Sequence, residues 1–253
     1  MPRPSSIAEL RAIAQPREYS PSITDRLYRL GSIYVSIPLA RVGATPNRIT
    51  VAWIVLGLAA VALVASESWL ARIGGALLLQ LSYLLDYVDG EVARLTGRKS
   101  AAGEFLDLVG HGLVKTSLPL GVGWSAAVET GSGALLAAGA LGAVAIAVGD
   151  TLRFYAACVS GALGAGDLGH VVPVRMAGKR WSPLGIGRAA FALSFESPGL
   201  YALTLVAALA DAMALLAVWW AVAGHVWWIS RAHRYARRLD TPPAVAAIVG
   251  GRE

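Results

Sequence analysis

Long apolar stretches separated by short polar segments dominate the chain from residue 49 onwards. Their lengths are close to the roughly 20 residues with which an α-helix crosses the hydrocarbon core of a membrane. The apolar positions run together instead of alternating with polar ones, which favours membrane helices over half-buried strands. The pattern predicts six transmembrane helices over residues 49–66, 70–92, 104–127, 133–156, 187–210 and 212–230. Only Asp211 marks the boundary between the last two, so that boundary is the weakest.

Positive charge alternates between successive loops of this arrangement. The segments after the second, fourth and sixth stretches are rich in Arg and Lys, whereas those after the first, third and fifth carry few charges. Cytoplasmic loops of membrane proteins carry an excess of Lys and Arg. The alternation therefore predicts a multi-pass protein of the cell (plasma) membrane with both termini in the cytoplasm.

The residues before the first stretch form a separate basic segment. Residues 22–41 are basic and partly amphipathic, which predicts a helix lying along the membrane interface, with a disordered basic tail as the alternative. We expect an all-α membrane protein in three parts. These are a cytoplasmic N-terminal segment with the interfacial helix (1–43), a six-helix transmembrane catalytic domain (44–231) and a cytoplasmic C-terminal tail (232–253).

Composition agrees with this interpretation. The 253 residues are 56% hydrophobic and 15% charged, against about 25% charged in a typical soluble domain. The net charge of +6 sits between apolar stretches, which favours lipid headgroups as partners over nucleic acid. The single cysteine, Cys158, excludes an intrachain disulfide, and its apolar setting predicts a buried, inert thiol.

Acidic residues gather between the second and third stretches. Asp86 and Asp89 are three residues apart, and Asp107 and His111 are four apart, so each pair shares a helix face. Two antiparallel helices joined by the short basic loop between them would bring all four side chains to one level. Carboxylates beside hydrocarbon are costly unless they are neutralised, and one or two Mg²⁺ or Mn²⁺ ions would do so. The alternative is solvated helix ends whose carboxylates pair with the basic loop.

The segment from Asp86 to His111 resembles the signature of the CDP-alcohol phosphotransferase (phosphatidyltransferase) family. That signature reads Asp, two residues, Asp-Gly, two residues, Ala-Arg, eight or nine residues, Gly, three residues, Asp, three residues, Asp. Seven of its eight positions are filled here with the right spacing, by Asp86, Asp89, Gly90, Ala93, Arg94, Gly103 and Asp107. The stretch ATPNRIT at 44–50 is similar to the Thr-Pro-Asn segment that enters the first span in this family.

The resemblance implies a membrane transferase of phospholipid biosynthesis. It would move a phospho-alcohol group, such as phosphatidyl, from a CDP-linked lipid or CDP-alcohol to the hydroxyl of a polar acceptor, releasing CMP at the cytoplasmic face. Asp86, Asp89 and Asp107 would hold the metal, and the protein would form a homodimer. Contacts to the CDP moiety are implied for Thr45, Pro46, Asn47, Arg48, Gly90, Ala93, Arg94, Ser100 and Gly103.

The eighth signature position departs from the family pattern. His111 stands where the family has a fourth Asp, the implied base for the acceptor hydroxyl and a ligand of the second metal. Imidazole can act as a base near neutral pH and binds Mn²⁺ better than Mg²⁺. His111 is therefore a catalytic base, a metal ligand that changes metal preference, or the mark of a site that binds nucleotide with lost or altered catalysis. Lys115 lies one turn further along the same face.

Basic residues near the fourth stretch are candidates for acceptor binding. The family often uses such residues for a phosphate-bearing acceptor, here Arg153 with Lys179, Arg180 and Arg188. They are equally well explained as determinants of membrane orientation. The rival function is a non-catalytic or retuned membrane protein that binds CDP-lipid or nucleotide. A transporter is disfavoured because the carboxylates cluster at one face instead of the midplane.

Overall fold

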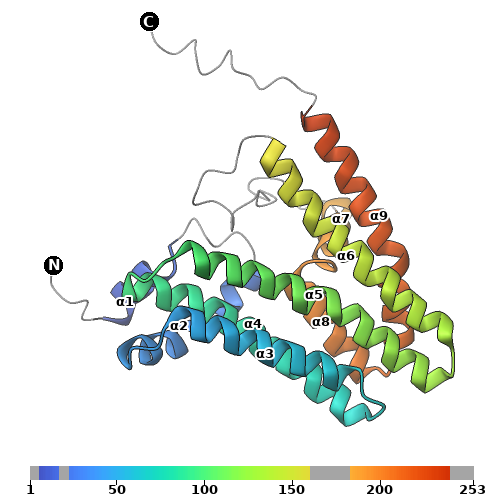
Figure 1. Ribbon diagram of the computed structural model, residues 1–253, viewed down its shortest axis with the longest axis horizontal. Coiled ribbons are helices and arrows are strands. Elements are labelled where there is room, and N and C mark those ends of the chain that lie inside the picture. Colours follow the sequence, from blue (N-terminus) through green and yellow to red (C-terminus); the bar gives the residue numbers. More distant parts are fainter. Residues whose placement is uncertain (1–5, 17–22, 160–182, 240–253) are drawn as a thin grey trace, which may run out of the picture.

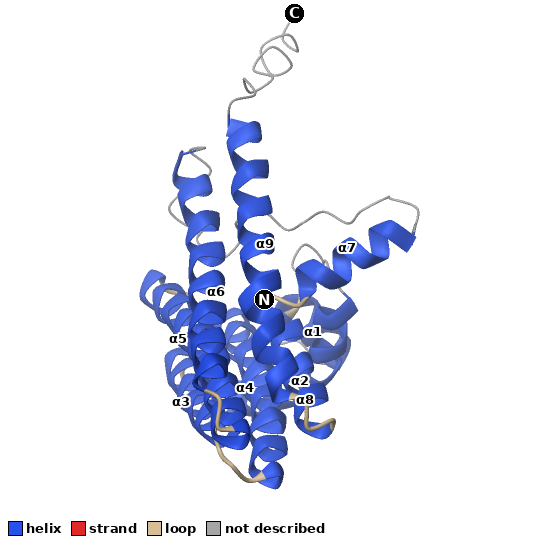
Figure 2. Cartoon of the chain, turned by 90° about the vertical axis from the view of Figure 1, so that its right-hand side faces the viewer, coloured by secondary structure: helices blue, strands red, loops and turns tan. Residues whose placement is uncertain are grey.

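The computed structural model describes residues 6–16, 23–159 and 183–239, and these residues form helices and turns without any strand. The helices are α1 (Ile7–Ala14), α2 (Ile23–Arg41), α3 (Pro46–Val64), α4 (Trp69–Thr96), α5 (Ala101–Thr130), α6 (Gly133–Val159), α7 (Pro183–Leu193), α8 (Ser197–Leu209) and α9 (Met213–Leu239). The prediction of an all-α protein is confirmed. In the bundle, α3 packs against both α4 and α5 (Figure 1), and α6 runs beside α9 (Figure 2).

Three of the described helices are long and apolar enough to cross a membrane: Pro46–Val64, Gly133–Ala156 and Met213–Arg237. A shorter apolar helix covers Ser197–Leu209. Many large apolar side chains also lie exposed on the helix surfaces, as expected of a protein whose outer face meets lipid. The chain is a membrane protein, while the count of six spans stays a prediction.

The expected fifth span, 187–210, is wrong as a single helix. The chain leaves the helical conformation after Leu193, and Glu196 is the N-cap residue of α8, in an extended conformation (φ −100°, ψ 155°). Pro198 follows in the first turn of α8, where its missing N–H leaves no hydrogen bond unmade. The break has a structural consequence, because it places the Glu196 carboxylate between α6 and α9.

Local sequence sets the turn that joins the two halves of the acidic segment. Gly97 ends α4 in the left-handed conformation, with φ 67°, which a residue without Cβ adopts at little cost. Ser100 then caps α5 by accepting a hydrogen bond from the backbone N–H of Gly103 at 3.1 Å. The chain thus reverses within a few residues, as the sequence predicted.

A charged cluster ties the helices together at the other end of α4. The buried Arg72 guanidinium lies 2.5 Å from the Glu129 carboxylate on α5 and 3.0 Å from that of Asp211. Asp211 occupies the turn between α8 and α9 with φ 52°, so the weak boundary expected there is a real turn. One side chain of α4 therefore holds both α5 and the turn between α8 and α9, which are distant in sequence.

Replacing Arg72 with methionine is expected to destabilise the bundle by about 1–3 kcal/mol, because charge-assisted hydrogen bonds are lost while the more exposed carboxylates regain water. The apparent melting temperature in detergent would fall accordingly. Arg26→Met, at an exposed position of α2, is the matched control. Equal melting temperatures for the two variants would contradict the stabilising role of the Arg72 ion pairs.

The two ends of the chain differ from expectation in detail. The helix expected over 22–41 is confirmed as α2, but the sequence did not predict α1, which packs against α2 and α4. At the other end α9 continues to Leu239, past the expected start of the tail. Cys158 is exposed, so the expectation of a buried thiol is wrong.

Candidate metal and nucleotide site

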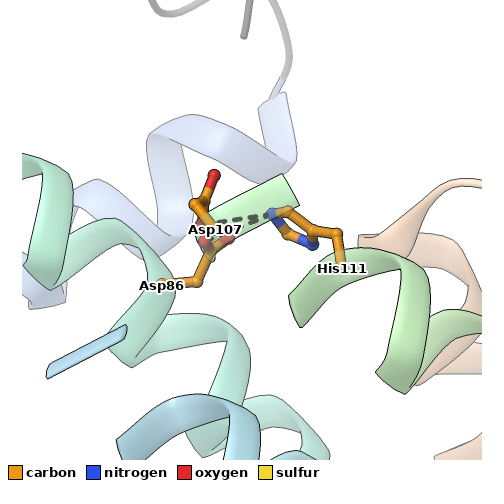
Figure 3. A group of neighbouring side chains, drawn as sticks. All are labelled: Asp86, Asp107 and His111. Carbon is orange, nitrogen blue, oxygen red and sulfur yellow. Dashed lines mark ion pairs between the residues drawn. The ribbon is translucent and has the colours of Figure 1, made fainter. Parts of the chain in front are cut away.

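Three side chains from the two halves of the acidic segment meet in one place. Asp86 on α4 and Asp107 and His111 on α5 each offer a ligand atom, and these atoms all lie within 4.8 Å of one another. Nε2 of His111 is 3.3 Å from Oδ1 of Asp86 and 3.9 Å from Oδ1 of Asp107 (Figure 3). All three side chains are partly exposed. The predicted juxtaposition of α4 and α5 therefore holds for these three residues.

The packing of α5 on α3 sets the position of the imidazole. A Cβ on Gly110 would lie 2.5 Å from the Ile54 side chain and 2.6 Å from the Trp53 ring, so only glycine permits this approach. The ring of His111, the next residue, then lies with its centroid 5.1 Å from that of Trp53. The Trp53 ring packs against the imidazole and holds it on the side of the carboxylates.

Asp89 is turned toward α3 instead of the three-residue group. Its Oδ2 accepts hydrogen bonds from Thr50 Oγ1 at 2.7 Å and from Trp53 Nε1 at 2.9 Å, and the residue is 7% exposed. Its role as a metal ligand stays a prediction. Sequence reasoning missed Thr50 and Trp53, although a hydroxyl and an indole N–H one turn apart in an apolar span are a signal for a buried acceptor.

The donor set of Asp86, Asp107 and His111 fits a divalent cation. Two carboxylates and an imidazole are suitable ligands for Mn²⁺ and, through their oxygens, for Mg²⁺. Oδ1 of Asp107 and Nδ1 of His111 are buried without a hydrogen-bond partner among the described residues. Such orphaned atoms are costly unless something else satisfies them. A bound cation next to Asp107 would do so for the carboxylate.

Predicted nucleotide-binding residues from two remote segments gather where α3 and α5 begin. A Cβ on Gly103 would lie 2.8 Å from Oδ1 of Asn47 and 3.2 Å from Oγ of Ser100. The absence of that Cβ therefore lets the start of α3 approach the start of α5. Pro46 is buried as the first residue of α3, whereas Arg48 is exposed. Thr45 precedes Pro46 as the cap residue and makes no side-chain cap hydrogen bond.

The remaining nucleotide-binding candidates lie at the end of α4. Nε of Arg94 donates to the backbone carbonyl of Ala14 at 2.5 Å. Its guanidinium folds back over Gly90, where a Cβ would lie 3.2 Å from the nearest guanidinium nitrogen. Ala93 is 8% exposed. The space above Gly90 is thus used by Arg94 itself, which sequence reasoning did not anticipate.

A second charged cluster lies one helical turn from His111. Lys115 Nζ is 2.6 Å from Oδ2 of Asp150, and Arg153 is 2.7 Å from Oε1 of Glu196 and 3.7 Å from Oδ1 of Asp150. Arg231 approaches Glu196 at 3.4 Å and Lys115 approaches it at 4.0 Å. Three cations and two carboxylates thus leave one positive charge in excess. Arg153 is therefore held by the carboxylates of Glu196 and Asp150.

Among the described residues, Arg188 is the other acceptor candidate, and it is not part of this cluster. Arg188 is exposed on α7, and no contact with the cluster is recorded among the described residues. Lys179 and Arg180 lie outside the described residues. Of the two candidates that the structure describes, Arg153 contacts other charged groups near the metal site and Arg188 does not.

Comparison with known proteins gives two matches. The model of the CDP-alcohol phosphatidyltransferase family matches residues 43–227. The archaetidylinositol phosphate synthase of Aeropyrum pernix is 45% identical over 69 residues, which cover 27% of this chain and 34% of that protein. The match to this relative thus spans about a third of its length, while the family match includes every described helix from α3 to α8.

Proposed function

Because the chain belongs to the CDP-alcohol phosphatidyltransferase family, we propose that it transfers a phosphatidyl-type group from a CDP-activated donor to the hydroxyl of a polar acceptor and releases CMP. The observation that carries this proposal is the meeting of Asp86, Asp107 and His111 across α4 and α5. Both halves of the signature contribute to that one group. The reaction belongs to phospholipid biosynthesis.

Asp86, Asp107 and His111 are the residues that would hold a divalent cation, with Asp89 as a further candidate. When bound, the cation offsets the negative charge of the donor pyrophosphate. Mg²⁺ and Mn²⁺ are both compatible with the carboxylate oxygens, and the imidazole favours Mn²⁺. One or two ions would satisfy this set.

The residues of the chain would orient the donor and take up the proton of the acceptor. The acceptor oxygen forms a bond to the β-phosphorus, and the bond between that phosphorus and the bridging oxygen breaks, so that CMP leaves with the bridging oxygen. The acceptor proton passes to His111, which we propose as the base in the state in which its imidazole does not ligate the cation, because a neutral imidazole has only one free lone pair. Asn47, Ser100 and Gly103 form the surface proposed to receive the nucleotide. Thr50 and Trp53 hold Asp89 in place.

Arg153 is the proposed contact for the acceptor, with Arg188, Lys179 and Arg180 as further candidates. The one excess positive charge of its cluster suits an acceptor with a single phosphate, such as a polyol phosphate. The name of the Aeropyrum pernix relative, archaetidylinositol phosphate synthase, supports an inositol phosphate as the first acceptor to try.

The setting of the reaction is also part of the proposal. We infer a multi-pass plasma-membrane protein with both termini and the active site on the cytoplasmic side, on the strength of the charge alternation. We also propose the domain limits 1–43, 44–231 and 232–253 from the sequence pattern. The homodimer is proposed because the family resemblance implies it. Crosslinking of the purified protein in lipid would test the dimer.

Measuring CMP release by the purified protein tests the function directly. CDP-diacylglycerol and soluble CDP-alcohols serve as donors, inositol phosphate, glycerol phosphate and free polyols as acceptors, and Mg²⁺ or Mn²⁺ as the cation. We expect release that requires donor, acceptor and metal together. Absence of release with every pair would contradict the proposal.

The second candidate is a membrane protein that binds the CDP moiety without turnover. The observation in its favour is His111, which replaces the fourth carboxylate of the family signature and removes one negative charge. Binding of CMP by calorimetry, combined with no release from any donor and acceptor pair, would favour this candidate.

A further inference from the structure

The mechanism leaves one buried carboxylate of the signature helix unused. Glu91 on α4 is 1% exposed. Its Oε1 accepts from Ser32 Oγ at 2.5 Å and from Gln15 Nε2 at 2.7 Å, and its Oε2 accepts from Ser36 Oγ at 2.6 Å. A buried carboxylate persists only where donors satisfy it, and here all three donors come from the N-terminal segment.

Gln15 is the link between this carboxylate and α1. Its side-chain amide donates both to Glu91 and to the backbone carbonyl of Arg29, each at 2.7 Å. Ala14, the last residue of α1, is fully buried against Ile33 and Ile37 of α2. The end of α1 is therefore fixed by polar contacts at Gln15 and by apolar packing at Ala14.

The fixed end of α1 touches a proposed donor-binding residue. The backbone carbonyl of Ala14 accepts the hydrogen bond from Nε of Arg94 at 2.5 Å. Arg94 is three residues after Glu91 and shares that face of α4. Its guanidinium lies over Gly90, within 3.4 Å of the position that a Cβ there would take. A carbonyl on Nε fixes the plane of a guanidinium, and hence the directions of its other donors.

We infer that α1 positions Arg94 for the donor, with Gln15 and Glu91 as the positioning residues. The inference rests on the proposed function and on the contact to the CDP moiety that the family resemblance implies for Arg94. Gln15 and Glu91 act through Arg94 and touch no substrate. The Ser32 and Ser36 hydroxyls orient the Glu91 carboxylate so that it faces Gln15.

Gln15→Met is the first variant, because it keeps the length of the side chain and removes both of its hydrogen bonds. We expect the KM for the CDP donor and the Kd for CMP to rise roughly three- to thirtyfold, as for the loss of one or two hydrogen bonds. The KM for the acceptor and kcat at saturating donor should stay unchanged. Ile13→Met, at an exposed position of α1, is the matched control.

Arg94→Lys separates positioning from simple support of the fold. Lysine lacks the guanidinium Nε–H that donates to the Ala14 carbonyl, so Arg94→Lys already removes the contact through which Gln15 would act. Adding Gln15→Met to Arg94→Lys should therefore change the donor KM less than twofold, because the effects of coupled sites are not additive. A full additive effect would overturn the inference. So would an unchanged donor KM and CMP Kd in Gln15→Met, or a fall in kcat and melting temperature without any change in donor KM.

Measurements of CMP release and CMP binding by the wild-type protein distinguish failure of this inference from failure of the proposed function. Wild-type CMP release together with an unaffected Gln15→Met variant would overturn the role of α1 and leave the function standing. If the wild type neither releases nor binds CMP, the proposed function is wrong, and the positioning role of α1 is wrong with it. Glu91→Met provides a second variant, because it removes the acceptor at the other end of the same hydrogen bond, with the same expected rise in donor KM.

Discussion

Replacing His111 with glutamine is expected to lower the maximal rate of CMP release by about 10²- to 10⁴-fold, the usual contribution of a positioned base. The amide oxygen of glutamine can still bind a cation, but it cannot take up a proton. The loss should therefore persist at saturating Mn²⁺. Steady-state CMP release, measured against Mn²⁺ concentration, gives this result directly.

A rate that saturating Mn²⁺ restores would assign His111 to metal binding instead of proton transfer. His225→Gln is the control, because its Nδ1 contacts the Ala221 carbonyl of its own helix α9. His111→Asp restores the eighth residue of the family signature and is expected to keep CMP release within about tenfold of the wild type, since a carboxylate can also accept a proton. Release by His111→Asp from a protein that is otherwise inactive would support the candidate that only binds nucleotide.

Replacing Asp86 or Asp107 with asparagine is expected to lower CMP release by about 10³-fold, because several kcal/mol of charge stabilisation depend on the cation site. Each variant removes one negative charge from the group whose ligand atoms lie within 4.8 Å of one another. A readout independent of activity follows from the same change. Mn²⁺ should raise the melting temperature of the wild type and have little effect on either variant.

Glu104→Gln is the matched control for the carboxylate series, because Glu104 lies one turn before Asp107 on α5 and outside the three-residue group. An undiminished Mn²⁺ effect in Asp107→Asn would exclude that carboxylate as a ligand. Asp89→Asn belongs in the same series, since its Oδ2 is bonded to Thr50 and Trp53. A lost Mn²⁺ effect there would make Asp89 a ligand through its other oxygen.

The sequence by itself determined the helical class and the three-residue core of the site. Long apolar stretches leave the backbone few options in lipid other than helix, and i, i+4 spacing places Asp107 and His111 on one face regardless of the rest of the fold. The turn chemistry of Gly97 and Ser100 then returns the chain, so Asp86 could be expected near them. These features are local, which is why a single sequence carries them.

Only the tertiary structure decided which remote partners each polar group meets. Asp89 faces Thr50 and Trp53 because α3 packs against both α4 and α5, and Arg94 meets the carbonyl of Ala14 although 80 residues separate them. Likewise the break before Pro198, which the apolar pattern hid, brings Glu196 to Arg153. Hydrophobic periodicity predicts which face of a helix is buried. It does not predict which helix covers that face, because the hydrophobic effect is non-directional. Partner choice for buried polar groups is set by the packing of whole helices.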